Sequence, residues 1–264
     1  MNGIVFDIGG THLRIARAES GALRDMERVD TPKDPHAAVE AFAAYCETHE
    51  LEAGSVAAGG FAGMVRDGVI LEAPNLPGWD GFDLAAALRE RCGFSIARLF
   101  NDAEVAGVGE ALLGAGNGYR VVGYITVSTG IGGALIIDGA PAPHGIGYEP
   151  GHQIIDLETM HTLEGLAGGM SLKKEFGAPP EELPRDILAS RARALAAGLY
   201  NVIRIWSPEV LVLGGSLMND ETGYPLDLVK KDLESLPVKL PPLPPIVHSA
   251  LGDEAGLRGA ALLL

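Results

Sequence analysis

The chain of 264 residues contains only two cysteines, Cys46 and Cys92. Each fits a helical pattern, so we expect reduced thiols in a core rather than a disulfide. No apolar run reaches the roughly 18–20 residues that a membrane-spanning helix needs. The first residues, MNGIVFDI, lack the basic start and the cleavage site of a signal peptide. The sequence therefore predicts a cytoplasmic protein without a membrane partner.

Basic residues are also scarce. The chain has 20 Lys and Arg against 35 Asp and Glu, which gives a formal net charge of −15. This charge should repel nucleic acids and anionic membranes. An anionic small molecule is still an acceptable ligand, provided that backbone N–H groups or a metal ion bind it locally.

Strands alternate with helices along the whole chain, which predicts an α/β fold. The pattern strand, glycine turn, strand occurs at residues 3–18 and again at 121–138, so we expect two related halves with a cleft between them. Apolar residues from Leu188 to Trp206 recur at steps of four and three, which is typical of a long amphipathic helix. The proline-dense stretch LPVKLPPLPPI, residues 236–246, is interpreted as a rigid connector.

The first glycine turn, DIGGTHLR at residues 7–14, has two readings. It is either a simple hairpin turn capped by Asp7 or a cradle in which the backbone N–H groups of Gly9 and Gly10 and the Thr11 hydroxyl bind phosphate. Asp7 would repel a bare phosphate, so the second reading requires a cation such as Mg²⁺ between them. The turn is not a P-loop, because no Gly-Lys-Ser/Thr follows.

Two further glycine turns follow strands in the second half. The stretch VSTGIGGAL, residues 127–135, has similar chemistry without an acid. The stretch LVLGGSL, residues 211–217, ends a buried strand in two glycines that could lie flat against a planar ring, although alone it reads as a strand-to-loop transition. The residues proposed for nucleotide binding in these turns are Ser128, Thr129, Gly130, Gly132, Gly133, Gly214 and Gly215. Together, the first two turns suggest one phosphate chain bound from both sides.

Asp102 stands where a strand ends and a helix begins, in the stretch FND at residues 100–102. An Asn-Asp pair at this point is an ordinary helix cap. A carboxylate there can also accept a proton from a hydroxyl group that attacks a γ-phosphate. The two roles do not exclude each other.

The chain resembles the ROK family of sugar kinases and repressors over nearly its full length. The resemblance is carried, in the family's order, by DIGGT, PNLPGW, NDAEVAGVGE, STGIGG, EPGH, LEGLAGG, LVLGGSL and LGDEAGLRGAALL. It implies a two-lobed, actin-like ATPase fold with ATP and sugar in the cleft. The expected lobes are a smaller one of residues 1–115, against which the helix 254–264 packs back, and a larger one of residues 116–253.

The resemblance also implies roles for individual residues. The position of Asp102 is that of the catalytic base, and Asp7 helps to hold Mg-ATP, as we expect through water. The residues matched to sugar ligands are Asn75, Asn101, Asp102, Glu149, His152 and Glu164. Carboxylates, amides and an imidazole suit a ring of hydroxyl groups, since each hydroxyl donates and accepts. A homodimer is what the family suggests.

Three departures from the family pattern concern the zinc site, the sugar site and the second phosphate turn. Most members carry a zinc site built from the His of the GH pair and a cluster of cysteines, whereas HQIIDLETMHTLE, residues 152–164, has no cysteine. We therefore predict no structural zinc. Tyr148 stands where the family usually has Gly and could narrow the pocket or stack on the sugar ring, and Ser128 also replaces a usual Gly.

The expected function is ATP-dependent phosphorylation of a hexose at its primary hydroxyl, of the glucokinase or hexokinase type. Fructose, mannose, allose, N-acetylmannosamine and N-acetylglucosamine stay open as substrates, because these sugars differ by single groups. A non-catalytic sugar-sensing module and an actin-like or chaperone-type ATPase are the alternatives from other classes. A DNA-binding repressor is not expected, because the first strand begins at residue 2 or 3 and leaves no room for a helix-turn-helix domain ahead of it.

The loop PNLPGW places a Trp among turn residues. We expect Asn75 to face the sugar and Trp79 to be the buried anchor of the loop, with an acceptor for its indole N–H. Pro74, Pro77 and Gly78 should stiffen the loop and reduce the entropy lost on binding.

Overall fold

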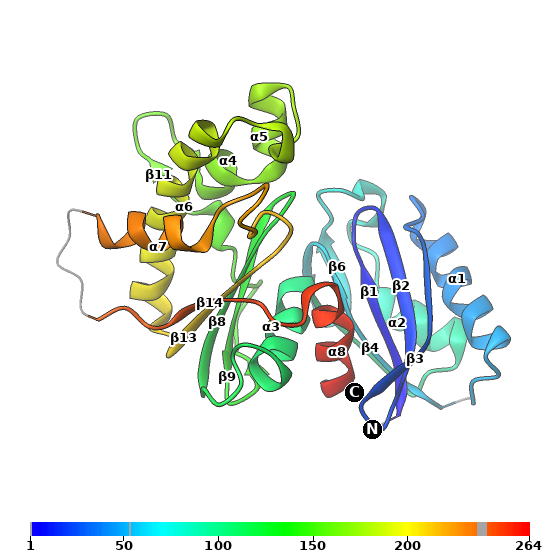
Figure 1. Ribbon diagram of the computed structural model, residues 1–264. Helices are drawn as coiled ribbons and strands as arrows, with labels where there is room; N and C mark the ends of the chain where they lie inside the picture. The colour runs from blue at the N-terminus through cyan, green and yellow to red at the C-terminus, as the bar shows by residue number, and fades with distance from the viewer. Residues whose placement is uncertain (1, 53, 237–241) are drawn as a thin grey trace. The chain divides into compact units, whose positions relative to one another are not determined.

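The structure is a computed structural model that describes residues 2–52, 54–236 and 242–264. Of the predicted connector at 236–246, residues 237–241 lie outside the described residues. The described residues form two compact units (Figure 1). Unit 1 comprises the described residues of Met1–Gly109, Pro143–Gly147 and Asp253–Leu264, and unit 2 comprises those of Glu110–Ala142 and Tyr148–Gly252.

Unit 1 is built on a five-stranded mixed sheet. Its strands lie in the order β3 (Ala22–Asp30), β2 (His12–Glu19), β1 (Gly3–Ile8), β4 (Val56–Phe61) and β7 (Ile96–Asn101). The first three strands pair antiparallel, while β1, β4 and β7 run parallel. A small hairpin, β5 (Met64–Arg66) and β6 (Val69–Glu72), follows β4.

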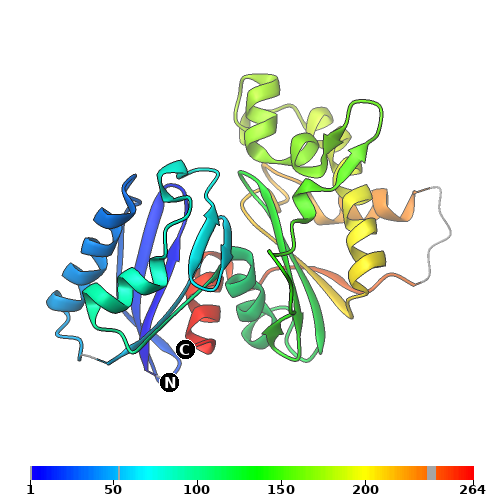
Figure 2. The ribbon, with the colours of Figure 1, turned by 180° about the vertical axis from the view of Figure 1, so that it is seen from behind.

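Helices cover both faces of this sheet. The side chains of β1 point alternately to the two faces of the sheet. Ile4, Phe6 and Ile8 pack into a core with α1 (Pro35–Thr48) and α2 (Leu84–Cys92), whereas Val5 faces the opposite side. Figure 2 shows α1 and α2 side by side on the first face. The other face receives α8 (Ala255–Leu262), which packs on β1 and β4.

Unit 2 repeats the same strand order. Its sheet runs β10 (Ala140–Pro141), β9 (Ile131–Ile137), β8 (Val121–Val127), β13 (Val210–Gly214) and β14 (Ile246–His248). Again the first three strands pair antiparallel and the last three run parallel. The α/β prediction is confirmed, and the two strand–turn–strand segments are the central hairpins of two sheets with the same topology.

The main core of unit 2 lies between one sheet face and a layer of helices. These are α4 (Leu163–Ala167), α5 (Gly169–Phe176), α6 (Arg185–Trp206) and α7 (Leu226–Glu234). Helix α6 is the amphipathic helix predicted from Leu188 to Trp206. The residues of the predicted stripe are buried as expected, with Trp206 partly covered: Leu188, Ala192, Leu195, Leu199 and Val202. A short hairpin, β11 (Ile154–Asp156) and β12 (His161–Thr162), precedes α4.

Helix α3 (Asp102–Leu113) begins in unit 1, and its final residues belong to unit 2. Cys46 and Cys92 are free thiols, each partly buried. Among residues 2–52, 54–236 and 242–264, no helix has the length and apolar character needed to cross a membrane.

Candidate functional site

The predicted residues of unit 1 lie along one edge of its sheet. In the parallel register Ile8 pairs with Phe61, and Phe61 pairs with Asn101. The turn after β1 and the Asn101–Asp102 pair, where β7 ends and α3 begins, therefore lie at the same edge of the sheet. This edge, formed by the carboxyl ends of parallel strands, is where α/β sheets commonly bind ligands.

The first glycine turn is closed by its own backbone. The Gly9 N–H donates to the His12 carbonyl at 2.9 Å, and the Thr31 hydroxyl donates to the Gly9 carbonyl at 2.7 Å. Thr11 is exposed at the tip. The turn is thus a tight hairpin in which the Gly9 N–H is already used. Phosphate binding by this turn stays a prediction.

Asp7 is ion-paired, which the sequence analysis did not predict. Its carboxylate contacts the guanidinium of Arg14, the residue directly opposite on β2. Arg14 also donates to the Asp253 carbonyl at 2.7 Å. Burial raises the pKa of Asp7, and the neighbouring Arg14 charge opposes that rise. A partly buried carboxylate with oxygen donors suits Mg²⁺, but Arg14 already contacts one of its oxygens.

The Trp79 loop brings Asn75 to the glycine turn. A methyl group placed on Gly10 would lie 2.7 Å from the Asn75 Cβ, so the two residues are in direct contact. Asn75 is exposed, whereas Trp79 is fully buried and donates its indole N–H to the Pro32 carbonyl at 3.1 Å. The prediction that Trp79 anchors the loop is confirmed, and the sugar role of Asn75 stays a prediction.

Asn101 and Asp102 form the start of α3. The Ala103 N–H donates to Asp102 Oδ1 at 2.8 Å and to Asn101 Oδ1 at 2.9 Å. The Asn101 amide also donates to the Gly63 carbonyl at 3.0 Å. Asp102 is only partly buried. Both side chains are therefore held by hydrogen bonds at the start of α3.

In unit 2, the second glycine turn sits on the start of α5. The Gly169 N–H donates to the Ser128 carbonyl and the Met170 N–H to the Thr129 carbonyl, both at 2.8 Å. The turn joins β8 to β9, so it also leaves the sheet at the carboxyl end of a parallel strand. Thr129 is exposed, while Ser128 and Gly130 are partly covered.

Glu164 lies directly against this turn. Its Oε2 accepts the Ile131 N–H at 2.7 Å, and a methyl group on Gly130 would lie 2.5 Å from the same oxygen. The Thr162 hydroxyl caps α4 by accepting the Gly165 N–H at 3.0 Å, which fixes Glu164 in the first turn of that helix. The structure thus places a predicted sugar ligand and a predicted phosphate turn side by side.

Glu164→Ala is expected to raise the KM for the sugar by about tenfold or more, because hydrogen bonds to a charged group contribute about 1.5–3 kcal/mol. Glu164→Gln is the sharper variant, since its carbonyl can still accept the Ile131 N–H while the charge is lost. Steady-state kinetics of the Gln variant should show a larger rise in the sugar KM than in the ATP KM. Equal rises would mean that Glu164 only supports the turn.

Glu149 precedes a short 3₁₀ turn, η2 (Pro150–His152), and His152 is its last residue; the turn packs against the start of β9. A methyl group on Gly151 would collide with the Ile131 carbonyl. Gln153 holds this loop, since its amide donates to the Pro150 carbonyl at 2.8 Å and its own carbonyl accepts from Asn201 at 2.8 Å. His152 is exposed and Glu149 is partly buried.

Tyr148 packs edge-on against Trp206 of α6, with ring centroids 5.3 Å apart. This contact assigns Tyr148 neither of the two roles considered from the sequence, which were stacking on the sugar ring and narrowing of the pocket. It shows instead that part of the ring surface is used inside unit 2.

The segment where the family usually has zinc-binding cysteines forms the β11–β12 hairpin. Its turn is closed by Asp156, which accepts the Glu158 N–H at 2.9 Å and the Thr159 hydroxyl at 2.6 Å. Thr159 Oγ1 also lies 2.8 Å from His161 Nδ1. Within the described part of the chain, no group of three or more His, Cys, Asp and Glu is placed to hold a metal ion. The absence of structural zinc stays a prediction.

The hydrogen bond from Thr159 and the N–H of Glu158 lower the pKa of Asp156 below its ordinary 3.8. A carboxyl group whose pKa is lower in the folded state stabilises the hairpin above the unfolded pKa, and this contribution is lost as the pH falls through the folded pKa. We expect the Asp156 carboxyl carbon, followed by NMR, to titrate below 3.8. A midpoint at or above 3.8 would show that the turn is not held by this carboxylate in solution.

Gly214 and Gly215 end β13 beside β8. Gly215 has φ +93° and its backbone lies against that of Val127, so a side chain here would be both strained and in collision. A methyl group on Gly214 would lie 2.7 Å from the Tyr124 hydroxyl. Close packing therefore explains both glycines without a ligand, and their proposed contact with a nucleotide ring stays a prediction.

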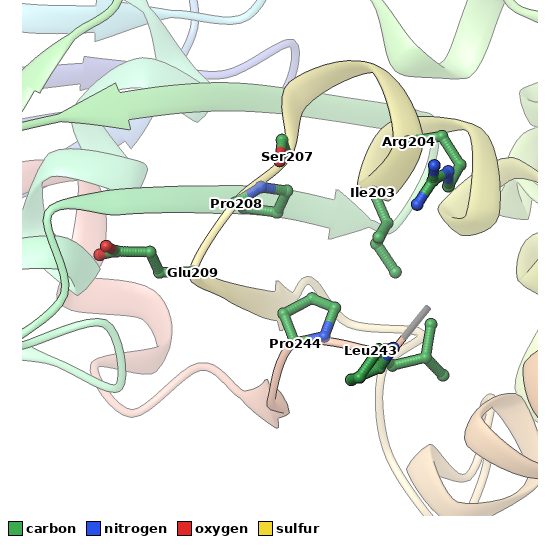
Figure 3. A pocket seen from close by; sticks show the side chains of 8 residues that line it. Ile203, Arg204, Ser207, Pro208, Glu209, Leu243 and Pro244 are labelled. Carbon is green, nitrogen blue, oxygen red and sulfur yellow. The ribbon is translucent and has the colours of Figure 1, made fainter. Parts of the chain in front are cut away.

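A groove of about 350 Å³ lies elsewhere on unit 2, between the end of α6 and residues 242–244 (Figure 3). Arg204, Ser207 and Glu209 contribute to its wall, at the beginning of β13 rather than at its Gly214 end. Of the described residues that line it, none was predicted to bind sugar or nucleotide. This groove is distinct from the candidate site.

The comparisons with known proteins match this arrangement. A model described as ROK family matches residues 3–264. The chain belongs to the ROK family. The ROK hexokinase of Thermus thermophilus aligns with a TM-score of 0.79 at 30% identity, covering 99% of this chain and 97% of that one.

Two further relatives span the ROK fold from end to end. The ROK glucokinase of Streptomyces griseus, solved with glucose and AMPPNP, aligns with a TM-score of 0.82 at 26% identity and covers 100% and 99% of the two chains. The N-acetyl-D-glucosamine kinase of Erwinia tasmaniensis is 30% identical over 98% of this chain and 97% of its own. The predicted actin-like ATPase fold is thereby confirmed.

Proposed function

We propose that the protein is an ATP-dependent sugar kinase that transfers the γ-phosphoryl group to the primary hydroxyl of a hexose, in the manner of a glucokinase or hexokinase. The observation that carries the proposal is the position of Asp102. Its carboxylate stands at the carboxyl edge of the sheet, in the first turn of α3, with one oxygen held by the Ala103 N–H at 2.8 Å. The exposed Asn75 and the glycine turn lie at the same edge.

In this proposal Asp102 accepts the proton of the attacking hydroxyl, and the hydroxyl oxygen attacks the γ-phosphorus in line. Asn75, Asn101, Glu149, His152 and Glu164 bind the remaining sugar hydroxyls. The backbone N–H groups of the two glycine turns bind and orient the phosphates, and Gly214 and Gly215 face the nucleotide ring. Charge on the phosphates is thus met by fixed dipoles, which suits a chain of net charge −15.

Mg²⁺ would supply neutralisation of phosphate charge. Asp7 is the residue that would hold it, and we propose contact through water because Arg14 already contacts its carboxylate. Arg14 would keep the Asp7 side chain in place through this contact.

The relatives support sugars as the substrate class without choosing one, since their names include glucokinase, N-acetyl-D-glucosamine kinase and kanosamine kinase. We propose glucose first, with fructose, mannose, allose, N-acetylmannosamine and N-acetylglucosamine as the alternatives. Sub-ångström differences in the pocket decide among them.

The test is sugar-dependent release of ADP in a coupled assay, with Mg-ATP and each of these six sugars. At least one sugar should stimulate ADP release well above the rate without sugar. Calorimetry on the same samples separates the alternative. A sugar that binds without stimulating ADP release would support a non-catalytic sensing module, and an absence of both would refute the sugar site.

We further propose a cytoplasmic homodimer, as the family resemblance suggests. Light scattering behind size exclusion measures the mass against the 27.5 kDa of one chain. A mass of one chain at assay concentration would overturn the dimer.

A further inference from the structure

A nearly buried carboxylate that the proposed reaction does not use lies in the same helical turn as Asp102. Glu104 is 6% exposed. One of its oxygens, Oε2, accepts the backbone N–H of Asn101 at 3.0 Å. The other, Oε1, is contacted by Nε2 of His144. Both residues belong to unit 1.

The first of these contacts completes a capping box at the start of α3. The Asn101 side chain accepts the Ala103 N–H at 2.9 Å, and Glu104, three residues after Asn101, accepts the Asn101 N–H in return. Each contact satisfies a backbone donor that the helix itself leaves unpaired. Glu104 therefore helps to orient the Asn101–Asp102 pair through the Asn101 N–H.

The second contact explains how Glu104 can be buried. A carboxylate removed from water is destabilised unless its oxygens are hydrogen-bonded, and one backbone N–H leaves the other oxygen unsatisfied. His144 supplies that partner from the distant segment Pro143–Gly147, and its side chain is 22% exposed.

We propose that Glu104 and His144 are positioning residues that hold the Asn101–Asp102 pair for proton acceptance. The proposal rests on the proposed sugar-kinase function. The imidazole fixes the Glu104 carboxylate, the carboxylate fixes the Asn101 N–H, and the first turn of α3 then fixes the direction of Asp102. Neither Glu104 nor His144 needs to touch the substrate.

The test compares His144→Ala, which removes the partner, with His144→Gln, whose amide can still donate to Glu104. His144→Ala should lower kcat by about tenfold or more, since a misplacement of about 1 Å can cost about 100-fold, while the KM for ATP changes little. His144→Gln should recover most of the loss. A matched control is His49→Ala, because His49 pairs with Glu27 at 2.8 Å elsewhere in unit 1. This control should leave kcat unchanged.

A second readout does not depend on activity. Hydrogen exchange of the Asn101 and Ala103 amides should accelerate in His144→Ala and in Glu104→Ala, but not in His49→Ala. Unchanged exchange, or a fall in melting temperature with wild-type kcat, would overturn the positioning role. If the wild-type protein releases no ADP with any sugar, the proposed function fails separately, and the exchange data alone then support or overturn the ordering of Asn101 by the pair.

Discussion

Asp102→Asn is expected to lower kcat for sugar-dependent ADP release by about 100-fold or more, because a positioned general base contributes about 10²–10⁴ to the rate. The substitution keeps the shape of the side chain. Its carbonyl oxygen can still accept the Ala103 N–H, which lies 2.8 Å from Asp102 Oδ1. The amide cannot accept the hydroxyl proton, so the loss should appear in kcat while the sugar KM changes much less.

Asp83 provides a matched control for this variant. It stands directly before α2 as its N-cap, and its Oδ1 also accepts a backbone N–H, that of Ala86, at 2.8 Å. Asp83→Asn should leave kcat unchanged and show that an Asp-to-Asn change at a helix start is harmless in itself. Turnover of Asp102→Asn within a fewfold of wild type would remove Asp102 from the role of base.

Trp79→Ala is expected to reduce the free energy of unfolding by about 3–5 kcal/mol, the usual cost of truncating a buried Trp to Ala. The ring is fully buried and packs on Phe61 and Phe82, with ring centroids 5.5 Å and 6.5 Å away. The variant also leaves the Pro32 carbonyl without its indole donor. Urea unfolding followed by circular dichroism measures the loss.

Trp79→Phe helps to separate the two contributions, because it keeps a buried aromatic ring while it removes the N–H donor and a smaller part of the packing. It should cost about 1–3 kcal/mol, the usual penalty for an unsatisfied buried acceptor together with a small packing defect. In both variants the sugar KM should rise while the protein is still folded, since the loop that carries Asn75 loosens. A loss below 1 kcal/mol for Trp79→Ala would show that the loop is anchored by other groups.

The parts of the fold that could be predicted from the sequence are those where burial requires apolar residues in a run or at a regular spacing. The buried apolar run of β1 and the apolar stripe of α6 are examples, and both were located within a few residues. Strand β3 gives no such pattern, because nearly all of its side chains are exposed at the edge of the sheet. Helix α5 begins at a glycine and is short, so its sequence reads as part of a loop.

The residues of the candidate site also differ in whether the local sequence predicts their contacts. Asp102 and the glycine turns carry local signals, because a helix start and a tight turn each require particular residue types. The Asp7–Arg14 pair could have been anticipated from opposite charges facing across a hairpin, and Glu104 from its capping-box spacing after Asn101. His144 and Gln153 gave no local signal, since the side chains that they contact, Glu104 and Asn201, lie 40 and 48 residues away in the sequence.

A motif alone does not assign a ligand contact to a residue that the fold also requires. Gly214 and Gly215 fit a nucleotide contact by resemblance, yet the close approach of β8 already requires small residues at both positions. Glu164 fits a sugar ligand by resemblance, yet it also holds the Ile131 N–H of the glycine turn. Variants at such positions must therefore preserve the structural contact while removing the proposed one.

The most direct test of the central claim is the identity of the product. The wild-type protein is incubated with Mg-ATP and the sugar that best stimulates ADP release, and the mixture is examined by ¹H–³¹P correlation NMR. We predict a new phosphate signal coupled to the methylene protons of the primary alcohol carbon, formed with the wild-type protein and nearly absent with Asp102→Asn. Inorganic phosphate as the only new phosphorus signal apart from ADP, or a phosphate coupled to a ring carbon proton, would contradict the proposed transfer to the primary hydroxyl.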